Sequence, residues 1–531
     1  MSSVPGMFSL VLHTHLPWFA HHGEWPIGEE LLYQAWGASY IPVIEELYQL
    51  ADDGYRGVLT LGITPTVAAQ LDDPHCQRGM LDWLANWQMR AHEACNYDDA
   101  TQERENHAAD SPHLTIDDIH TLGQRELSRA HWTWNRYLQR WQSGGSPVFR
   151  ALVDTGVVEM LGGPLAHPFQ PLLTQPMRRF LLQAGLNDGA LRTSQRTTGI
   201  WAPECAYTPG MEEDYAAAGV THFMVDGPSF RGDTALGRPV RDSDVVAFAR
   251  DLTVSYRVWS PKAGYPGHPD YRDFHTFHHA TGFKPARVTG RNIDPTRKKP
   301  YDPDRALKRL EHDVTDFVET VIHRLHTETA RIGRPAHVVA AFDTELFGHW
   351  WYEGPLWLGK VIRALDAAGV TLGTFEQAQH AGYVGDPFDL PNCSWGSGKD
   401  WRVWEGPAVS DIVELNQQLQ DELRDFITGV IPARSESTLR PRHRIADQVV
   451  QEAALALQSD WAFLISKNTA ADYAQQRAFL HAHAMREIIA AYRAGDTREA
   501  EKLCAAWSTA DAPFPQLDAR QLRDVYDEED S

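Results

Sequence analysis

The chain has 531 residues, and its 49 basic and 71 acidic side chains give a formal net charge of −22 at pH 7. With 43% hydrophobic and 23% charged residues, the composition is that of a globular protein and excludes a wholly disordered chain. The acidic balance disfavours binding to nucleic acid or to an anionic membrane. A domain takes about 100–200 residues, so the length predicts several domains, or one large barrel with additions.

Seven segments have the apolar character of buried strands, and several end in polar or acidic residues. In chain order they span 8–13, 57–63, 157–163, 199–203, 222–226, 245–250 and 337–344. Helical spacing of apolar residues occurs over 29–50 and near 314–332. Strands that alternate with helices favour parallel β/α units, and a β/α barrel carries its active site at the C-terminal strand ends. The pattern therefore favours a barrel, but it leaves the number of strands open.

Two further regions have helical patterns without strands. Residues 77–108 and 117–143 are polar and helix-like, and we interpret about 77–145 as a helical insertion in a catalytic barrel that spans 1–385. The rest of the chain, 386–531, is expected to form an α-helical C-terminal domain, with helices over 409–428, 444–458, 470–494 and 497–507. The acidic run near residue 530 is expected to be a frayed tail.

The cysteines and the N-terminal segment bear on the compartment. The apolar run from Phe8 to Leu12 follows no basic segment, and it is too short for a signal peptide or a membrane span. An odd number of cysteines without C-x-x-C spacing indicates neither a disulfide framework nor a Cys-based zinc site. We expect a cytoplasmic protein that is a monomer or a weak homo-oligomer. The five cysteines are Cys76, Cys95, Cys205, Cys393 and Cys504.

Two histidines end the first predicted strand, in the sequence His13-Thr14-His15. Alternate residues of a strand point to the same side, so both imidazoles are expected to face one pocket. The pattern suits a metal site, and it also suits hydrogen bonds to a polar substrate. His167 follows a turn of glycine and proline and is expected above the same strand ends, although a lone loop histidine is more often structural.

Two carboxylates, Glu204 and Asp343, each follow an apolar strand. A buried carboxylate is costly unless it is hydrogen-bonded or functional, so we favour a functional role for both. Cleavage of a glycosidic bond requires one carboxyl group to protonate the leaving oxygen and a second to attack the anomeric carbon or to activate water. The Gly-rich loop 394–404 carries three Trp residues, whose flat faces and N–H groups suit a sugar.

These motifs resemble those of glycoside hydrolase family 57, and within it the α-1,4-glucan branching enzymes. The similarity is nearest to actinobacterial members linked to methylglucose lipopolysaccharide or glycogen-like glucans. It implies an α/β fold: an incomplete, seven-stranded (β/α)7 barrel with a helical insertion and an all-α C-terminal domain. The family's first four motifs match residues 13–17, 163–167, 201–204 and 342–350.

The resemblance implies a retaining branching reaction on an α-glucan, with some hydrolysis and without a metal ion or other cofactor. Glu204 is then the nucleophile and Asp343 the general acid/base, and the cleaved α-1,4 chain is transferred to a 6-hydroxyl. Phe230 is the nearest aromatic residue on the loop 227–244, where branching members carry a Tyr, so it is expected to cover the site without offering a hydroxyl. The remaining implied glucan contacts are His13, His15, His167, Arg250, Trp259, Gly267, His349, Trp395, Trp404, Asp460 and Thr469.

Three alternatives stay open at the level of the sequence. An amylase or a 4-α-glucanotransferase could use the same scaffold. A metal-dependent polysaccharide deacetylase could use His13, His15, His167 and Asp226 as its ligands. A catalytically silent glucan-binding protein is a third reading, which the intact carboxylate pair argues against.

Overall fold

The computed structural model describes residues 4–98, 114–260, 262–435 and 439–529, and the seven predicted strands are all present in it. They form a parallel set in the order β7-β5-β4-β3-β2-β1-β8. Two short strands were not predicted: β6 (Arg238–Pro239), antiparallel to β7, and β9 (Thr371–Leu372), parallel to β1. The seven are β1 (Met7–Thr14), β2 (Leu59–Ile63), β3 (Val158–Gly162), β4 (Gly199–Ile200), β5 (His222–Asp226), β7 (Val246–Arg250) and β8 (His337–Asp343).

The two ends of this parallel set lie next to each other. The backbone N–H of Asp251, directly after β7, donates to the carbonyl oxygen of Val339 in β8 at 2.8 Å. Within the sheet, His13 pairs in register with Asp343, and Asp226 pairs with Arg250. Because parallel strands all end at the same edge, the register gathers these polar residues at one rim of the sheet.

Both faces of the sheet are covered, as expected for parallel strands. On β1, Leu10 and Leu12 pack in a cluster with the surrounding helices, whereas Val11 packs in the cluster on the other face. The helices that accompany the sheet are α1 (Glu29–Ala35), α2 (Ile41–Asp52), α3 (Pro65–Asp72), α7 (Gly145–Asp154), α8 (Gln175–Thr193), α9 (Met211–Ala217), α10 (Leu252–Trp259), α11 (Pro303–Ile332), α12 (Gly354–Ala367) and α13 (Phe375–His380).

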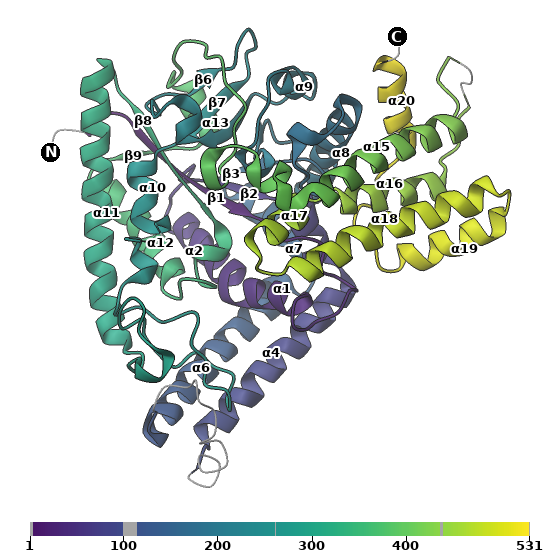
Figure 1. Ribbon diagram of the computed structural model, residues 1–531. Helices are drawn as coiled ribbons and strands as arrows, with labels where there is room; N and C mark the ends of the chain where they lie inside the picture. The colour runs from purple at the N-terminus through teal and green to yellow at the C-terminus, as the bar shows by residue number, and fades with distance from the viewer. Residues whose placement is uncertain (1–3, 99–113, 261, 436–438, 530–531) are drawn as a thin grey trace.

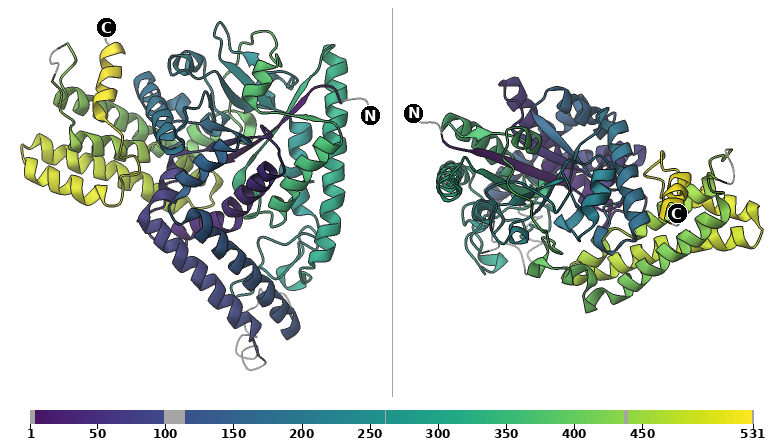
Figure 2. Two further views of the ribbon diagram at one scale, coloured as in Figure 1. Left: turned by 180° about the vertical axis from the view of Figure 1, so that it is seen from behind. Right: turned by 90° about the horizontal axis from the view of Figure 1, so that it is seen from above.

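The predicted insertion is a pair of helices, α4 (Pro74–Cys95) and α6 (Ile116–Arg136), which extend side by side away from the sheet (Figures 1 and 2). Asp73 caps the first helix by accepting from two backbone N–H groups, and Thr115 caps the second in a capping box. The first helix ends at Cys95 and not at residue 108 as predicted; residues 99–108 lie outside the described part of the chain.

The C-terminal part is helical, and Figure 2 shows it beside the sheet on the side opposite α11. Its helices share a hydrophobic cluster with Leu165, Phe169 and Phe180, which follow β3. The acidic run at 527–529 is the last turn of a helix and not a frayed tail, because Leu522 and Tyr526 anchor that helix in the cluster. The helices are α14 (Arg402–Glu405), α15 (Ser410–Val430), α16 (Arg444–Ala456), α17 (Ser459–Lys467), α18 (Ala471–Arg493), α19 (Thr497–Ser508) and α20 (Ala519–Glu529).

Among the described helices, none is long and apolar enough to cross a membrane.

Candidate active site

Glu204 lies in a tight turn, Pro203–Cys205, just after β4. Both Glu204 (φ 60°) and Cys205 (φ 50°) adopt the left-handed conformation, which is uncommon for residues other than glycine. Such strained turns are found where a structure fixes a functional side chain. The predicted strand over 199–203 therefore stops at Ile200, and the turn presents the Glu204 carboxyl at the sheet rim.

Two distant segments donate hydrogen bonds to the Glu204 carboxylate. The Ser459 hydroxyl donates to Oε1 at 2.7 Å, and the Trp395 indole N–H donates to Oε2 at 2.9 Å. Burial raises the pKa of Glu204 to about 7, although both hydrogen bonds act in the opposite direction. Glu204 is 8% exposed, so these two donors take the place of most of the water that would otherwise bind its carboxylate.

Asp343 is the last residue of β8 and lies beside His13 in the sheet. Burial raises its pKa to about 6, while the positive charges of Arg250 and His15 pull it down. A carboxyl group that holds its proton closer to neutral pH than an ordinary aspartate can act as a proton donor. The sheet thus places two carboxyls with raised pKa values at the ends of two strands, β4 and β8.

The three predicted histidines meet in one stack. The ring centroids of His15 and His167 are 3.7 Å apart, those of His13 and His167 are 5.2 Å apart, and His13 stacks on Trp201 at 4.2 Å. Burial and the neighbouring His15 keep the pKa values of His13 and His167 well below 6.5, so both are neutral near pH 7. The ring centroids of His13 and His15 lie 5.9 Å apart, so the two strand histidines lie on the same side of the strand, as expected.

His15 joins the strand to the C-terminal helices. Its Nε2 lies 2.9 Å from Oδ2 of Asp460 on α17, and its Nδ1 lies 3.1 Å from the hydroxyl of Thr64. Burial lowers the pKa of His15, but the carboxylates of Asp460, Glu204 and Glu345 outweigh this effect and raise it overall. His15 is therefore the histidine of the stack that gains positive charge most easily.

Asp226 is held by two cations and is not available as a metal ligand beside the histidines. Nε of Arg250 donates to Oδ1 of Asp226 at 2.9 Å, and the Lys399 ammonium lies 2.5 Å from Oδ2. Among the described residues, the cluster at this rim with metal-ligand spacing is His15, His167 and Asp460, with ligand atoms within 4.8 Å of one another. The ligand set of the deacetylase alternative is therefore not assembled.

Comparison with known proteins gives the family. The profile described as glycosyl hydrolase family 57 matches residues 9–382, and that described as 1,4-alpha-glucan branching enzyme, C-terminal, matches residues 420–521. The chain belongs to glycosyl hydrolase family 57.

Relatives and solved structures match over almost the whole chain. A protein of Mycobacterium tuberculosis described as "Probable 1,4-alpha-glucan branching enzyme" is 57% identical over 98% of this chain and 99% of its own length. A crystal structure of a family 57 branching enzyme from Pyrococcus horikoshii superposes with a TM-score of 0.87 at 26% identity and covers 97% of this chain and 96% of that chain. The α-amylase AmyC from Thermotoga maritima shares the fold, with a TM-score of 0.81, 24% identity, and coverage of 98% and 99%.

Three residues that contact carboxyl groups at this rim were not predicted from the sequence. Ser459 begins helix α17, which the sequence pattern did not reveal, and Tyr40 donates to the Glu345 carboxyl at 2.6 Å. Lys399 anchors the Trp loop (residues 394–404), since its ammonium also donates to the carbonyl oxygen of Trp395 at 2.9 Å. No local sequence pattern reveals these three residues, because each contacts a carboxyl group that is far away in the chain.

The Trp loop is only in part what the sequence predicted. Trp395 faces Glu204 and lies edge-on to Trp201, with centroids 5.1 Å apart. Trp404 is a core residue instead: it is 1% exposed and stacks on Phe169 at 4.7 Å, because α14 turns it into the C-terminal hydrophobic cluster. The expectation that all three Trp residues of this loop face a sugar is wrong for Trp404.

The other predicted contacts are spread over the molecule. Trp259 packs against Trp350 at 6.0 Å, and burial lowers the pKa of the nearby His349 to about 3. Gly267 and Thr469 are exposed. These positions are not joined to the carboxyl pair by hydrogen bonds in the described part of the chain.

Phe230 ends the short helix after β5 and is buried in a hydrophobic cluster. It is 2% exposed and packs against Phe388, with centroids 5.1 Å apart. The same cluster contains Phe223 and Val225 of β5, whereas Met224 between them faces the cluster on the other side of the sheet. This position gives no support to the expected cover of the site by Phe230.

Proposed function

We propose that the protein is a retaining 1,4-α-glucan branching enzyme. The observation that carries the proposal is the hydrogen-bonded Glu204 carboxylate, held at the rim where β8 presents Asp343. The 57% identity to a protein described as a branching enzyme, over nearly the full length of both chains, supports this assignment.

In this mechanism Glu204 attacks the anomeric carbon of an α-1,4 bond while Asp343 gives its proton to the leaving glycosidic oxygen. The donor chain is then bound covalently to Glu204, and Asp343 is left as a carboxylate. Asp343 next removes the proton of a glucan 6-hydroxyl, whose oxygen displaces Glu204 and forms an α-1,6 bond. Two displacements at the same carbon retain the configuration, and this requires the two carboxyls to lie about 5–5.5 Å apart.

The contacts of Glu204 distinguish its role from that of Asp343. Trp395 can only donate a hydrogen bond, so the oxygen that it contacts must be an acceptor, and Ser459 approaches the other oxygen. These two hydrogen bonds stabilise the carboxylate form of Glu204, which a nucleophile requires, against the effect of burial. Among the described residues, Asp343 accepts no such pair of side-chain hydrogen bonds.

The sheet and helices fit the architecture that this function uses. We infer that the seven parallel strands form an incomplete (β/α)7 barrel within residues 1–385, with the insertion at about 77–145. Residues 386–531 are assigned to an all-α C-terminal domain, which contributes Ser459 and Asp460 to the site. We assign no metal ion or other cofactor to the reaction. The α-glucan contacts are assigned to His13, His15, His167, Arg250, Trp259, Gly267, His349, Trp395, Asp460 and Thr469.

The test is product analysis on amylose. The purified protein should convert amylose into a product whose α-1,6 linkages are visible by proton NMR and removable by a debranching enzyme. Reducing ends released without α-1,6 linkages would identify an amylase, and longer linear chains would identify a 4-α-glucanotransferase. Either result would overturn the branching assignment.

A further inference from the structure

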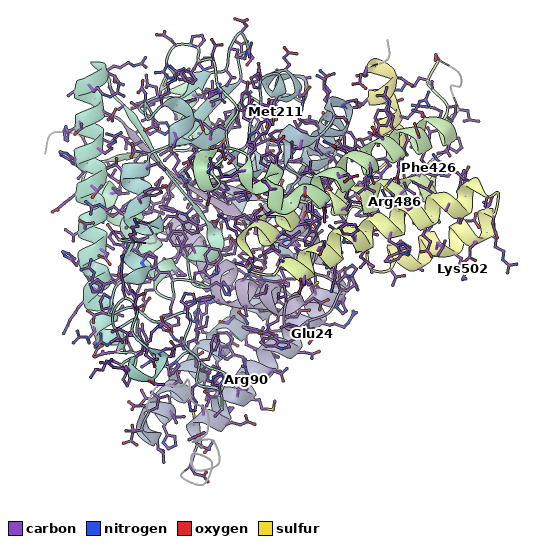
Figure 3. The ribbon with its side chains drawn as sticks, in the orientation of Figure 1. Glu24, Arg90, Met211, Phe426, Arg486 and Lys502 are labelled. Atoms are coloured by element: carbon purple, nitrogen blue, oxygen red, sulfur yellow. The ribbon has the colours of Figure 1, made fainter. Side chains whose placement is uncertain are left out.

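A pocket lies between the helical insertion and the segment that follows β8. Its cavity volume is about 130 Å³. Helices α4 and α6 form one side, and the loops around residues 272–284 and 348–352 form the other. Arg90, labelled in the lower part of Figure 3, belongs to its lining and projects from α4. None of the groups assigned above to proton transfer or covalent catalysis lines this pocket.

Aromatic rings form much of the pocket wall. Trp83 and Trp87 lie 5.2 Å apart on α4, and Phe274 lies across from them on the 272–284 loop. Trp350 is 38% exposed, although it is a large apolar side chain. Aromatic faces that remain open beside a cavity suit the stacking of a flat or ring-shaped ligand.

Three cations line the same cavity without a carboxylate partner. Arg90 lies over Phe283 at 5.3 Å, Arg129 over Tyr352 at 4.4 Å, and Lys284 over Phe274 at 3.6 Å. In the part of the chain that the structure describes, none of these three forms a salt bridge, although the protein as a whole carries a net charge of −22.

The carboxylates that line the pocket are already engaged. Glu126 is paired with Arg272, Asp273 lies 2.7 Å from the Lys298 ammonium, and Glu30 accepts from the Trp83 indole at 3.0 Å. Glu126 and Asp273 each have a cation as their direct partner, so among the described residues Arg90, Arg129 and Lys284 keep donors that no carboxylate occupies in a salt bridge. Burial and the charges of Arg272 and Arg129 lower the pKa of Lys284 to about 7, although Asp273 and Glu126 act in the opposite direction.

We propose that this pocket binds a sugar phosphate, with the phosphate on Arg90, Arg129 and Lys284 and the sugar ring against the aromatic wall. Guanidinium groups bind phosphate through paired, charge-assisted hydrogen bonds, and an ammonium group adds a point charge. The cavity has room for on the order of ten water molecules, which is the size of a small organic ligand rather than of a lone ion.

The ligand would lie against the segment that carries the general acid/base. His349 and Trp350 line the pocket, and the backbone N–H of Trp350 donates to the carbonyl oxygen of Glu345 at 3.2 Å. Asp343, Glu345 and Trp350 lie within eight consecutive positions, so one short segment connects the pocket to the proposed general acid/base. His349, which is assigned above to glucan binding, lines this pocket, so the sugar-phosphate site adjoins the proposed glucan site, but its binding can be measured without turnover.

The test is isothermal titration calorimetry of the full-length protein with glucose 1-phosphate and glucose 6-phosphate. Inorganic phosphate serves as a ligand that offers only one half of the proposed chemistry. We expect at least one sugar phosphate to bind more than about tenfold tighter than inorganic phosphate, since both contact types contribute. Equal binding of inorganic phosphate, or binding of neither sugar phosphate, would overturn the proposal.

Two variants locate the site. Lys284→Met keeps the packing on Phe274 and removes the charge, and Arg90→Gln removes a second cation from a partly exposed position. Each should weaken sugar-phosphate binding by about tenfold or more. Lys502→Met is the control, because this exposed lysine lies on α19 far from Arg90 (Figure 3). Unchanged affinity in both pocket variants would place the ligand elsewhere and contradict the proposal.

The pH dependence gives a readout that loss of structure would not produce. Above about pH 7 the ligand's phosphate is fully charged while Lys284 loses its proton, so affinity in the wild type should fall between pH 7 and 8.5. The other charged or titratable groups that face Lys284 are Arg129, Arg272, Glu126, Asp273 and His349. The fall should be absent in Lys284→Met, and an equal fall in both proteins would contradict the assigned role of the lysine.

Discussion

The hydroxyl of Ser459 donates a hydrogen bond to Oε1 of Glu204 at 2.7 Å, although 255 positions of the chain separate the two residues. The same hydroxyl lies 3.0 Å from Nδ1 of His167, and the next residue, Asp460, binds His15. The first residues of helix α17 thus contact side chains that follow β4, β3 and β1. The C-terminal helices therefore supply side chains to the proposed catalytic site.

Removal of this contact should lower turnover more than binding. In Ser459→Ala the Glu204 carboxylate loses one of two donors, and its pKa, already about 7, should rise further. A hydrogen bond to a charged group contributes about 1.5–3 kcal/mol, so kcat at neutral pH should fall roughly 10- to 100-fold with little change in KM. Steady-state assays on amylose measure this, with Ser508→Ala on α19 as a control that should retain full activity.

The roles of the two carboxyls can be separated by the configuration of a rescued product. Glu204→Ala and Asp343→Ala should each lose roughly 10³-fold or more of the wild-type rate. With an activated α-maltosyl donor and azide, azide can replace the missing nucleophile directly in Glu204→Ala and give a β-azide. In Asp343→Ala, azide should attack the covalent intermediate on Glu204 and give an α-azide.

NMR of the azide products distinguishes the α-azide from the β-azide. Asp386→Ala, at an exposed position, is the control and should behave as wild type. An α-azide from Glu204→Ala, or a β-azide from Asp343→Ala, would show that the two roles are assigned the wrong way round.

The buried carboxyls should make the protein less stable as the pH rises. Burial raises the pKa of Glu204 to about 7 and that of Glu345 to about 8, from 4.5. The folded state keeps these protons where the unfolded state has lost them, so their contribution is present below about pH 4.5 and is lost as the pH rises through 7 and 8. Glu204→Gln and Glu345→Gln should therefore raise Tm relative to wild type by a few degrees at pH 8.

The difference in Tm should disappear well below pH 4.5, where the wild-type carboxyls are protonated in both states. Thermal unfolding followed by circular dichroism at the two pH values measures it. Glu501→Gln, at an exposed position of α19, is the matched control and should change Tm little at either pH. A stabilisation of equal size at both pH values would show that charge burial is not its cause.

Local patterns predicted the strands well and the distant contacts poorly. His222–Asp226 was predicted to the residue, since an apolar run bounded by polar residues specifies a buried strand. The break after Ile200 was missed because a left-handed conformation at Glu204 has no apolar or glycine pattern to reveal it. Trp404 was assigned to a sugar surface because composition does not show which face of a four-residue helix is buried.

The residues that complete the site could be reached only through the tertiary structure. Nothing in the sequence around Ser459 or Lys399 distinguishes them from other polar residues near a helix end or in a loop. Their roles arise because α17 and the Trp loop both fold back onto the sheet rim. Asp460 was found through the family resemblance and not from its own surroundings.

Phe230 should affect stability and not the outcome of the reaction. Its ring is buried against Phe388, so Phe230→Ala should leave a cavity and cost about 3–5 kcal/mol, whereas Phe230→Leu should cost less. The ratio of α-1,6 transfer to hydrolysis should be the same in Phe230→Leu as in wild type. Chemical denaturation and product analysis measure the two effects. A lower transfer ratio in a fully folded Phe230→Leu protein would restore the covering role first expected for this residue.

Trp395 is then the aromatic residue best placed to keep water from the covalent intermediate. Its indole donates to Glu204 and lies edge-on to Trp201, and Arg250 lies 5.4 Å from its ring. Water greatly exceeds any glucan acceptor in concentration, so transfer depends on how the cover excludes it. Trp395→Phe removes the N–H and shrinks the ring, and Trp395→Ala opens the space entirely.

We expect the share of hydrolysis to rise in Trp395→Phe and to rise further in Trp395→Ala. Reducing ends report hydrolysis and the α-1,6 proton signal reports transfer, and both can be measured in one reaction on amylose. Trp401→Phe is the matched control, because Trp401 belongs to the same loop but donates to the carbonyl oxygen of Cys393 instead of to Glu204. If only the two Trp395 variants change the ratio of α-1,6 transfer to hydrolysis, the exclusion of water depends on the contact between Trp395 and Glu204. An equal change in Trp401→Phe would mean that the loop as a whole, and not the indole of Trp395, excludes water.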